Sequence, residues 1–228
     1  MKPPLIYMIR ADITADYVEP HHEWYARRHA PDLMAAGFWS ARGYDSPTSP
    51  ILWNVYEVPD AAIFSSDAYN SGHRADPFLE TAVKKLHGRT VSLYTQVRIV
   101  DANGRDMERA RTLLGRYLAS LRLATTADAS SVTRWFADRV VEAHKGAAGL
   151  RSIRLWEQRE SHPKWPTTEP RWSVGVEWDT QAQLERAQVR RLLAEAAAAP
   201  ELSASVAKID VVWKRYGLLR DDVFDDLA

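Results

Sequence analysis

Alternating hydrophobic and polar positions near the start of the chain predict a β-strand over Leu5–Asp12. Leu5, Tyr7 and Ile9 fall on one face of it, because successive side chains of a strand point to opposite sides. Helical spacing follows from about Ala15 to Ala36, and Gly37 ends the helix, as glycine often does past a helix terminus.

The remaining segments of the first half are assigned in the same way. They are a strand at Phe38–Tyr44, a loop at Asp45–Pro50, a strand at Ile51–Val58, a helix opened by Pro59-Asp60, and a strand at Thr90–Val100 after Gly88. After the polar connector Asp101–Asp106 the order repeats. The repeat comprises a strand at Leu114–Ala124, a helix at Ser130–Ala148, a strand at Leu150–Gln158, a Pro-rich loop at Ser161–Pro170, a strand at Trp172–Trp178, a helix at Gln181–Ala199 capped by Asp179 or Thr180, and a strand at Val206–Tyr216.

The two halves can be aligned residue by residue. The matched positions are Trp24-Tyr25 with Trp135-Phe136, Gly37 with Gly149, Arg42 with Arg154, Tyr44 with Trp156, and Glu57 with Glu177. So many spaced matches indicate a tandem duplication. The predicted units are residues 1–105 and 106–220, followed by an acidic tail at 221–228.

A β-α-β-β-α-β order predicts a four-stranded antiparallel sheet with both helices on one face, the ferredoxin-like arrangement. The other face of such a sheet is left uncovered and must be buried. The predicted fold class is therefore α+β, with two ferredoxin-like units in one chain packed sheet against sheet as a dimeric α+β barrel.

Composition narrows the function classes. The chain has 228 residues, 30 basic and 30 acidic side chains, and no cysteine. Balanced charge argues against nucleic-acid and membrane-surface partners. Without cysteine there is no disulfide, thiolate metal site or cysteine nucleophile. With no signal peptide or apolar span in the sequence, we expect a cytoplasmic protein.

One segment resembles a known family. His22-Glu23-Trp24-Tyr25, His29-Ala30-Pro31, Gly37-Phe38 and Arg42-x-Tyr44 resemble the first helix and second strand of EthD-like proteins, which belong to the dimeric α+β barrel group. The second half keeps only the Trp-Phe, glycine and arginine positions. The resemblance implies small-molecule isomerases, cyclases, cofactor-free monooxygenases or proteins of degradative pathways, with haem binders among more distant relatives.

His29 is the strongest catalytic candidate. His21, Tyr25 and His29 share a helix stripe at a spacing of four. We expect Pro31 to break or bend the chain at Ala30, so that His29 points into a cavity. Its counterpart in the second half is Val140, and a histidine transfers protons near neutral pH. The alternative is a buried histidine that bonds a backbone carbonyl. His21 and His29 are about 12 Å apart along the axis, which argues against a shared metal ion.

Further candidates lie on the predicted second and third strands. Phe38, Ser40, Arg42 and Tyr44 alternate onto one face, where Arg42 would need a partner, either Glu57 in an ion pair or an anionic substrate group. Trp53, Asn54 and Tyr56 are expected to line the same pocket or to fill the core. His73, in Ser-Gly-His-Arg, would lie in a lid or in a solvated loop, and Ser161–Pro170 is expected to cover a pocket mouth or a neighbouring subunit.

The sequence therefore predicts a cofactor-independent enzyme that transfers protons on a small aromatic or apolar carbonyl compound, as an isomerase, cyclase, dehydratase or lyase. His29, Arg42 and Tyr44 would be catalytic, and the substrate would contact His22, Trp24, Tyr25, Trp53 and Tyr56. The expected partners are a small molecule and, in a homodimer, a second copy of the chain. The alternatives are a haem or small-ligand binder without turnover, and a non-catalytic interaction module.

Overall fold

The structure is a computed structural model, and it describes residues 3–46, 50–74, 76–108, 113, 115–165, 167, 169–179, 199–202 and 205–219. The helix expected at Gln181–Ala199, its alternative cap Thr180 and the acidic tail lie outside the described residues. For strand β8 (Ser205–Leu219) the structure describes the backbone only.

The chain forms two compact units. Unit 1 comprises Met1–Tyr94, Glu160–Thr168 and Lys214–Ala228, and unit 2 comprises Thr95–Arg159 and Glu169–Trp213. Strands β4 (Leu86–Asp101) and β8 therefore contribute residues to both. The segment Glu160–Thr168 follows a strand of unit 2 in sequence, yet it packs with unit 1.

In unit 1 the central strand is β3 (Ile51–Val58), which has the predicted bounds. It pairs antiparallel with β1 (Leu5–Ile13) and with β2 (Ser40–Asp45). Tyr56 lies opposite both Tyr7 and Ala41, so these three residues share one face of the sheet.

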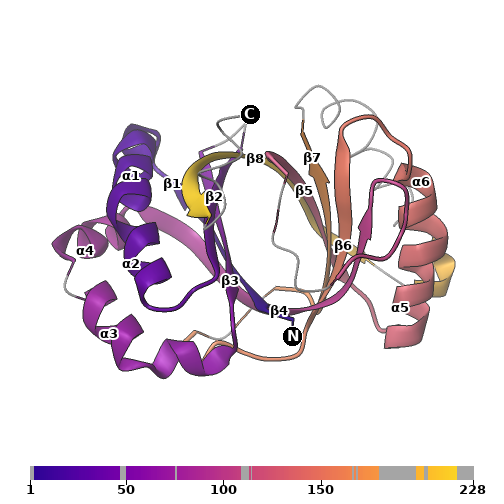
Figure 1. Ribbon diagram of the computed structural model, residues 1–228, viewed down its shortest axis with the longest axis horizontal. Coiled ribbons are helices and arrows are strands. Elements are labelled where there is room, and N and C mark those ends of the chain that lie inside the picture. Colours follow the sequence, from indigo (N-terminus) through magenta and orange to yellow (C-terminus); the bar gives the residue numbers. More distant parts are fainter. Residues whose placement is uncertain are drawn as a thin grey trace. The chain divides into compact units, whose positions relative to one another are not determined.

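The helices of unit 1 cover that face (Figure 1). They are α1 (Val18–Trp24), a π-helical turn at Tyr25–His29, α2 (Ala30–Ala35), α3 (Asp67–Arg74) and α4 (Pro77–Lys84). Gly37 ends the first helical region with φ 104°, a conformation that glycine adopts without strain. His73 lies within α3 rather than in a loop, so the expected Ser-Gly-His-Arg lid or loop is wrong.

In unit 2, β7 (Trp172–Trp178) pairs antiparallel with β6 (Leu150–Gln158) and with β5 (Tyr117–Ala124), and β5 also pairs with β8. The bounds of β6 and β7 are those predicted. The helices α5 (Ala129–Trp135) and α6 (Glu142–His144) flank a second π-helical turn, Phe136–Val141. Asp128 caps α5 by accepting the N–H of Ser131 at 2.9 Å.

The two hairpins have equivalent registers. Ser40 lies opposite Glu57 as Ser152 lies opposite Glu177, and the serine hydroxyl donates to the glutamate in both. Arg154 completes an ion pair with Glu177 at 3.1 Å, with both side chains fully buried. For Arg42, at the matched position of unit 1, such an ion pair with Glu57 is one of the two expected partnerships, the other being with an anionic substrate group.

The two hairpins differ in the sizes of the side chains at two matched positions. Arg42 lies opposite Val55, whereas Arg154 lies opposite Gly175. The glycine leaves room for the Trp156 ring, because a Cβ at Gly175 would lie 2.2 Å from a ring carbon. At the matched position of Trp156 unit 1 has the smaller Tyr44.

Gly175→Ala should therefore overpack unit 2 and lower the free energy of unfolding by about 2 kcal/mol or more. In a Trp156→Phe background the same change should be much less destabilising, because the ring atoms that it meets are gone. Chemical denaturation of the four proteins measures the coupling. Equal effects in both backgrounds would show that the ring does not set the requirement for glycine.

Candidate functional site

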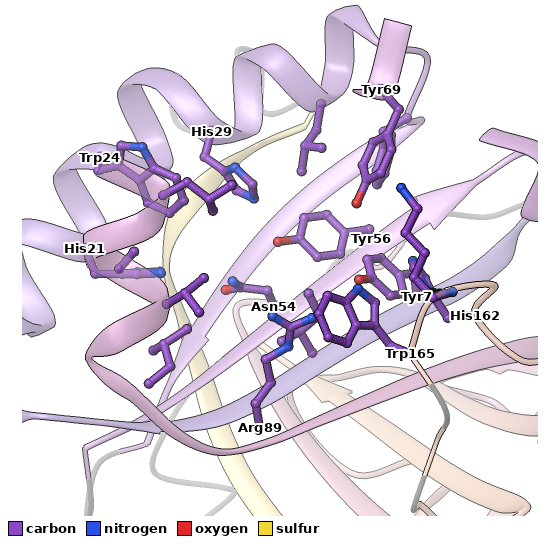
Figure 2. Close-up of a pocket in the computed structure, with 18 of the residues that line it drawn as sticks. Tyr7, His21, Trp24, His29, Asn54, Tyr56, Tyr69, Arg89, His162 and Trp165 are labelled. Carbon is purple, nitrogen blue, oxygen red and sulfur yellow. Dashed lines mark hydrogen bonds between the residues drawn. The ribbon is translucent and has the colours of Figure 1, made fainter. Parts of the chain in front are cut away.

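A cavity of about 290 Å³ lies in unit 1, between the helices and the helix-covered face of the sheet. Its walls are mostly aromatic and aliphatic, and a few polar side chains converge on it, which is typical of small-molecule sites. Figure 2 shows the labelled side chains around the space. They are Tyr7, His21, Trp24, His29, Asn54, Tyr56, Tyr69, Arg89, His162 and Trp165.

The helical wall depends on the π-helical turn. Residues five apart in an α-helix point about 140° apart around the axis. Across Tyr25–His29 the N–H of Ala30 bonds to the carbonyl of Tyr25, five residues back, so the turn is wider. Trp24 and His29 therefore lie on one face and stack, with ring centroids 4.5 Å apart and planes 24° apart.

The expected helix break at Pro31 is wrong. Ala30 is helical, with φ −64° and ψ −45°, and Pro31 lies in the first turn of α2. Unit 2 has a π-helical turn at the matched position without any proline, so the widened turn does not require Pro31.

The Trp24 side chain is held in place by residues of α4 and its N-cap. Its indole N–H donates to Asp76 at 2.6 Å, and Arg28 lies 3.3 Å from the same carboxylate. Asp76 also caps α4 by accepting the N–H of Phe78 at 2.9 Å. The Phe78 ring stacks on Trp24 at 5.2 Å, so α4 holds the indole that supports His29.

The sheet contributes Tyr7, Asn54 and Tyr56. Tyr7 and Tyr56 stack at 5.4 Å. Burial raises the pKa of both phenols well above the usual value near 10, helped by the neighbouring tyrosines. Both hydroxyls are therefore protonated at neutral pH and can donate hydrogen bonds. The neighbouring side chain of Tyr25 also raises the pKa of Tyr56, whereas that of Asn54 lowers it.

The third wall comes from the segment Glu160–Thr168. His162 is buried, with its ring 5.3 Å from Tyr7 and 4.3 Å from Phe64. Lys164 donates to the side-chain oxygen of Asn70 at 2.9 Å, and Arg89 lies over the Trp165 ring at 4.4 Å. The loop expected to cover a pocket mouth or a neighbouring subunit thus lines the cavity with three of its residues.

Two of the three histidines in the wall are held neutral. Burial, and to a lesser extent His22, lowers the pKa of His21 to about 3. Burial lowers the pKa of His162 to about 4, with contributions from the positive charges of Arg89 and Lys164. Both imidazoles are uncharged at neutral pH and are weak bases.

The structure brings together only some of the candidate residues. Trp24, His29 and Tyr56 line the cavity, and Tyr25 packs behind them, 5.4 Å from His29 and 6.3 Å from Tyr56. His22 lies next to His21 but turns away from the cavity, and its Nε2 lies 2.8 Å from Asp45.

Arg42, Tyr44 and Trp53 do not line the cavity. All three are buried on the sheet face opposite to Tyr56, because odd and even positions of β3 point to opposite sides. Grouping Trp53 with Asn54 and Tyr56 in one pocket is thus wrong. Phe38 does line the cavity, but it precedes β2 and does not share the face of Arg42.

Sequence reasoning did not select several cavity residues. The predicted strand placed Tyr7 on an apolar face, which gave no signal beyond core packing. Arg89, at the start of a long strand, carries no motif. His162, Lys164 and Trp165 lie far from unit 1 in sequence, and only the expectation of a loop over a pocket pointed to them.

Two further findings concern metals and membranes. Among the described residues, no cluster of three or more histidine, aspartate or glutamate side chains has the geometry to hold a metal ion. In the same part of the chain no helix has the length and hydrophobicity needed to cross a lipid bilayer.

Comparisons with known proteins support the fold. No protein-family model matches the sequence, and a search of curated proteins gives no significant match. Solved structures do match. An anthrone oxidase-like protein has a TM-score of 0.61 at 8% identity, and the match covers 96% of this chain and 93% of that one.

Two other solved structures resemble the chain over nearly its whole length. A proposed monooxygenase from Lactobacillus acidophilus has a TM-score of 0.53 at 12% identity, covering 96% and 100% of the two chains. A haem-binding protein from Thermus thermophilus has a TM-score of 0.52 at 9% identity, covering 94% and 92%. The predicted fold class is confirmed: the chain has the mixed α+β fold of ferredoxin-like, dimeric α+β barrel proteins.

The neutral state of His162 predicts a specific pH dependence of stability. Its folded pKa of about 4 lies below the ordinary value of 6.5, so the unfolded chain takes up the proton first as the pH falls. This histidine therefore contributes stability above about pH 6.5 that is lost toward pH 4. Between pH 7 and pH 4, wild type should lose on the order of 2 kcal/mol more than His162→Phe.

Urea denaturation at a series of pH values measures this difference. His87→Phe is the matched control, because His87 is exposed on β4 and does not line the cavity. Parallel curves for wild type and His162→Phe would show that His162 is not held neutral in the folded protein.

Proposed function

We propose that the protein is an enzyme that removes a proton from a carbon activated by a carbonyl group in a small, planar aromatic compound. The observation that carries the proposal is the placement of His29, packed on Trp24, in the wall of an aromatic cavity whose other histidines are weak bases. The resemblance in fold to an anthrone oxidase-like protein supports a substrate of this class.

Each wall of the cavity has a role in the proposed step. The carbon–hydrogen bond breaks, its proton passes to an imidazole nitrogen of His29, and the electron pair moves onto the carbonyl oxygen as an enolate. The side-chain amide of Asn54 and the protonated hydroxyl of Tyr56 line the cavity and would donate hydrogen bonds to that oxygen. They replace Arg42 and Tyr44, which lie on the other face of the sheet.

The aromatic walls favour this step in two ways. Tyr7, Trp24, Phe38 and Tyr56 present flat surfaces that can orient a fused-ring substrate. The same surfaces exclude water, which strengthens the interaction of the enolate oxygen with its donors. The enolate is an intermediate common to isomerisation, cyclisation, dehydration and reaction with oxygen, so this first step can be tested apart from its outcome.

Haem, which one similar structure binds, does not fit this cavity. A space of about 290 Å³ is small for a four-pyrrole ring. All three histidines of the cavity wall lie flat against aromatic rings, His29 on Trp24, His162 on Tyr7 and His21 on Tyr25. No haem chemistry is part of the proposal, and a Soret band after expression with added haem would contradict it.

We also infer that the two halves arose by duplication within the EthD-like family. The equivalent hairpin registers, the matched Ser–Glu pairs and the two π-helical turns support this. On this view the second half exchanged the histidine for Val140 and retained the scaffold.

The test uses anthrone in D₂O without oxygen, with NMR detection of deuterium entering its methylene group. Wild type should accelerate this exchange over buffer. His29→Val, which introduces the residue of the second half, should lower the acceleration by about 10²–10⁴-fold. The change should leave the free energy of unfolding within about 1 kcal/mol, because Val140 is accommodated at the matched turn.

His87→Val is the control and should exchange protons at the wild-type rate. Full activity of His29→Val together with a large loss of stability would assign His29 to the scaffold and refute its role as base. Oxygen uptake measured afterwards with the same proteins reports the fate of the enolate.

A further inference from the structure

The end of the cavity formed by the segment Glu160–Thr168 carries positive charge that no described carboxylate neutralises. Arg89 and Lys164 both line the cavity. In the described part of the chain, no carboxylate lies within ion-pair distance of either, and the residues that line the cavity include no aspartate or glutamate. The remaining polar groups at this end are uncharged at neutral pH, including His162 and Tyr7.

The effect of this charge is visible on its neighbours. Arg89 and Lys164 both act to lower the pKa of His162, and Arg89 acts in the same direction on Tyr7. In each case positive charge disfavours the more positive form of the group. The potential at this end of the cavity is therefore positive over both side chains.

Both cations contact a neighbouring side chain before any ligand binds. The Arg89 guanidinium lies over the Trp165 ring at 4.4 Å, an arrangement that leaves its N–H groups in the guanidinium plane available as donors (Figure 2). Lys164 donates to Asn70 at 2.9 Å, which occupies one of the three ammonium protons.

We infer that the ligand of this cavity is an aromatic carboxylate, whose rings lie among the aromatic walls and whose carboxylate binds Arg89 and Lys164. Guanidinium and ammonium groups are the usual partners of carboxylates, and the bonds are strong where water is partly excluded. This inference deepens the proposed function, on which it rests, by naming the substrate class.

The arrangement also orients the ligand. His29 comes from the helical wall, whereas Arg89 comes from β4 and Lys164 from the segment after β6. Figure 2 shows His29 and Arg89 approaching the space from opposite sides. A carboxylate bound at Arg89 directs the far end of the rings toward His29, Asn54 and Tyr56.

The experiment compares naphthoate with naphthamide, which have the same ring system and differ in charge. Isothermal titration calorimetry should show that wild type binds naphthoate at least tenfold more tightly. Arg89→Gln and Lys164→Gln should each weaken naphthoate binding by about tenfold and leave naphthamide binding within about twofold. Added salt should weaken naphthoate binding alone.

Lys145→Gln is the matched control, because Lys145 is an exposed lysine paired with Glu142 in unit 2 and should bind both compounds as wild type does. Equal affinity of wild type for the two compounds, or no binding of either, would overturn the inference. An equal loss of naphthoate and naphthamide affinity in Arg89→Gln would also overturn the inference, because Arg89 would then contribute only to the shape of the wall.

The outcomes separate this inference from the proposed function. Anthrone is uncharged, so its exchange in D₂O tests His29 without using Arg89 or Lys164. A preference for naphthoate without anthrone exchange would keep the carboxylate site and reject the proton transfer. Anthrone exchange without a preference for naphthoate would keep the proton transfer and reject the carboxylate site.

Discussion

In the helix that follows β1, the N–H of Ala30 bonds to the carbonyl of Tyr25, and this one widened turn determines which side chains face the cavity. With regular α-helical spacing, His29 would share a stripe with Tyr25 and His21. The wider turn places it on Trp24 instead. The Trp24 indole is in turn fixed by Asp76, the cap of α4. The position of the candidate base thus depends on a backbone hydrogen bond and on a helix cap 47 residues further along the chain.

This dependence explains how far the sequence could predict the site. Apolar, β-rich runs between turn residues located β3, β6 and β7 with their observed bounds, and these strands are buried on both faces over nearly their whole length. The alternation of side chains along a strand should have separated Trp53 from Tyr56, since they are three residues apart on one strand. The π-helical turn has no sequence signature comparable to a cap or a glycine, so a stripe drawn at intervals of four residues selected Tyr25 and missed the stacking of Trp24 on His29.

Long-range packing was the other part that local patterns could not supply. His162, Lys164 and Trp165 follow β6 in sequence but pack with unit 1, and the contacts that hold them there are aromatic stacking and one hydrogen bond to Asn70. Their partners Tyr7, Phe64 and Asn70 lie about 90 to 160 residues away in the chain. Local propensity contains no information about such pairs. It indicated only that the Pro-rich segment would be a loop.

The segment Glu160–Thr168 also gives a physical reason for the two halves to remain in one chain. Unit 1 has its own strands, helices and aromatic core, yet one wall of its cavity and one of the two cations come from sequence beyond Gln158. Unit 2 has a matching π-helical turn, with Val140 at the position that corresponds to His29. The backbone carbonyl of Val140 accepts a hydrogen bond at 2.8 Å from His144 in the next turn. The turn can therefore serve as scaffold without an imidazole at that position. The second half of the sequence therefore contributes to the cavity of unit 1 through the loop that follows β6, although its own π-helical turn has no histidine.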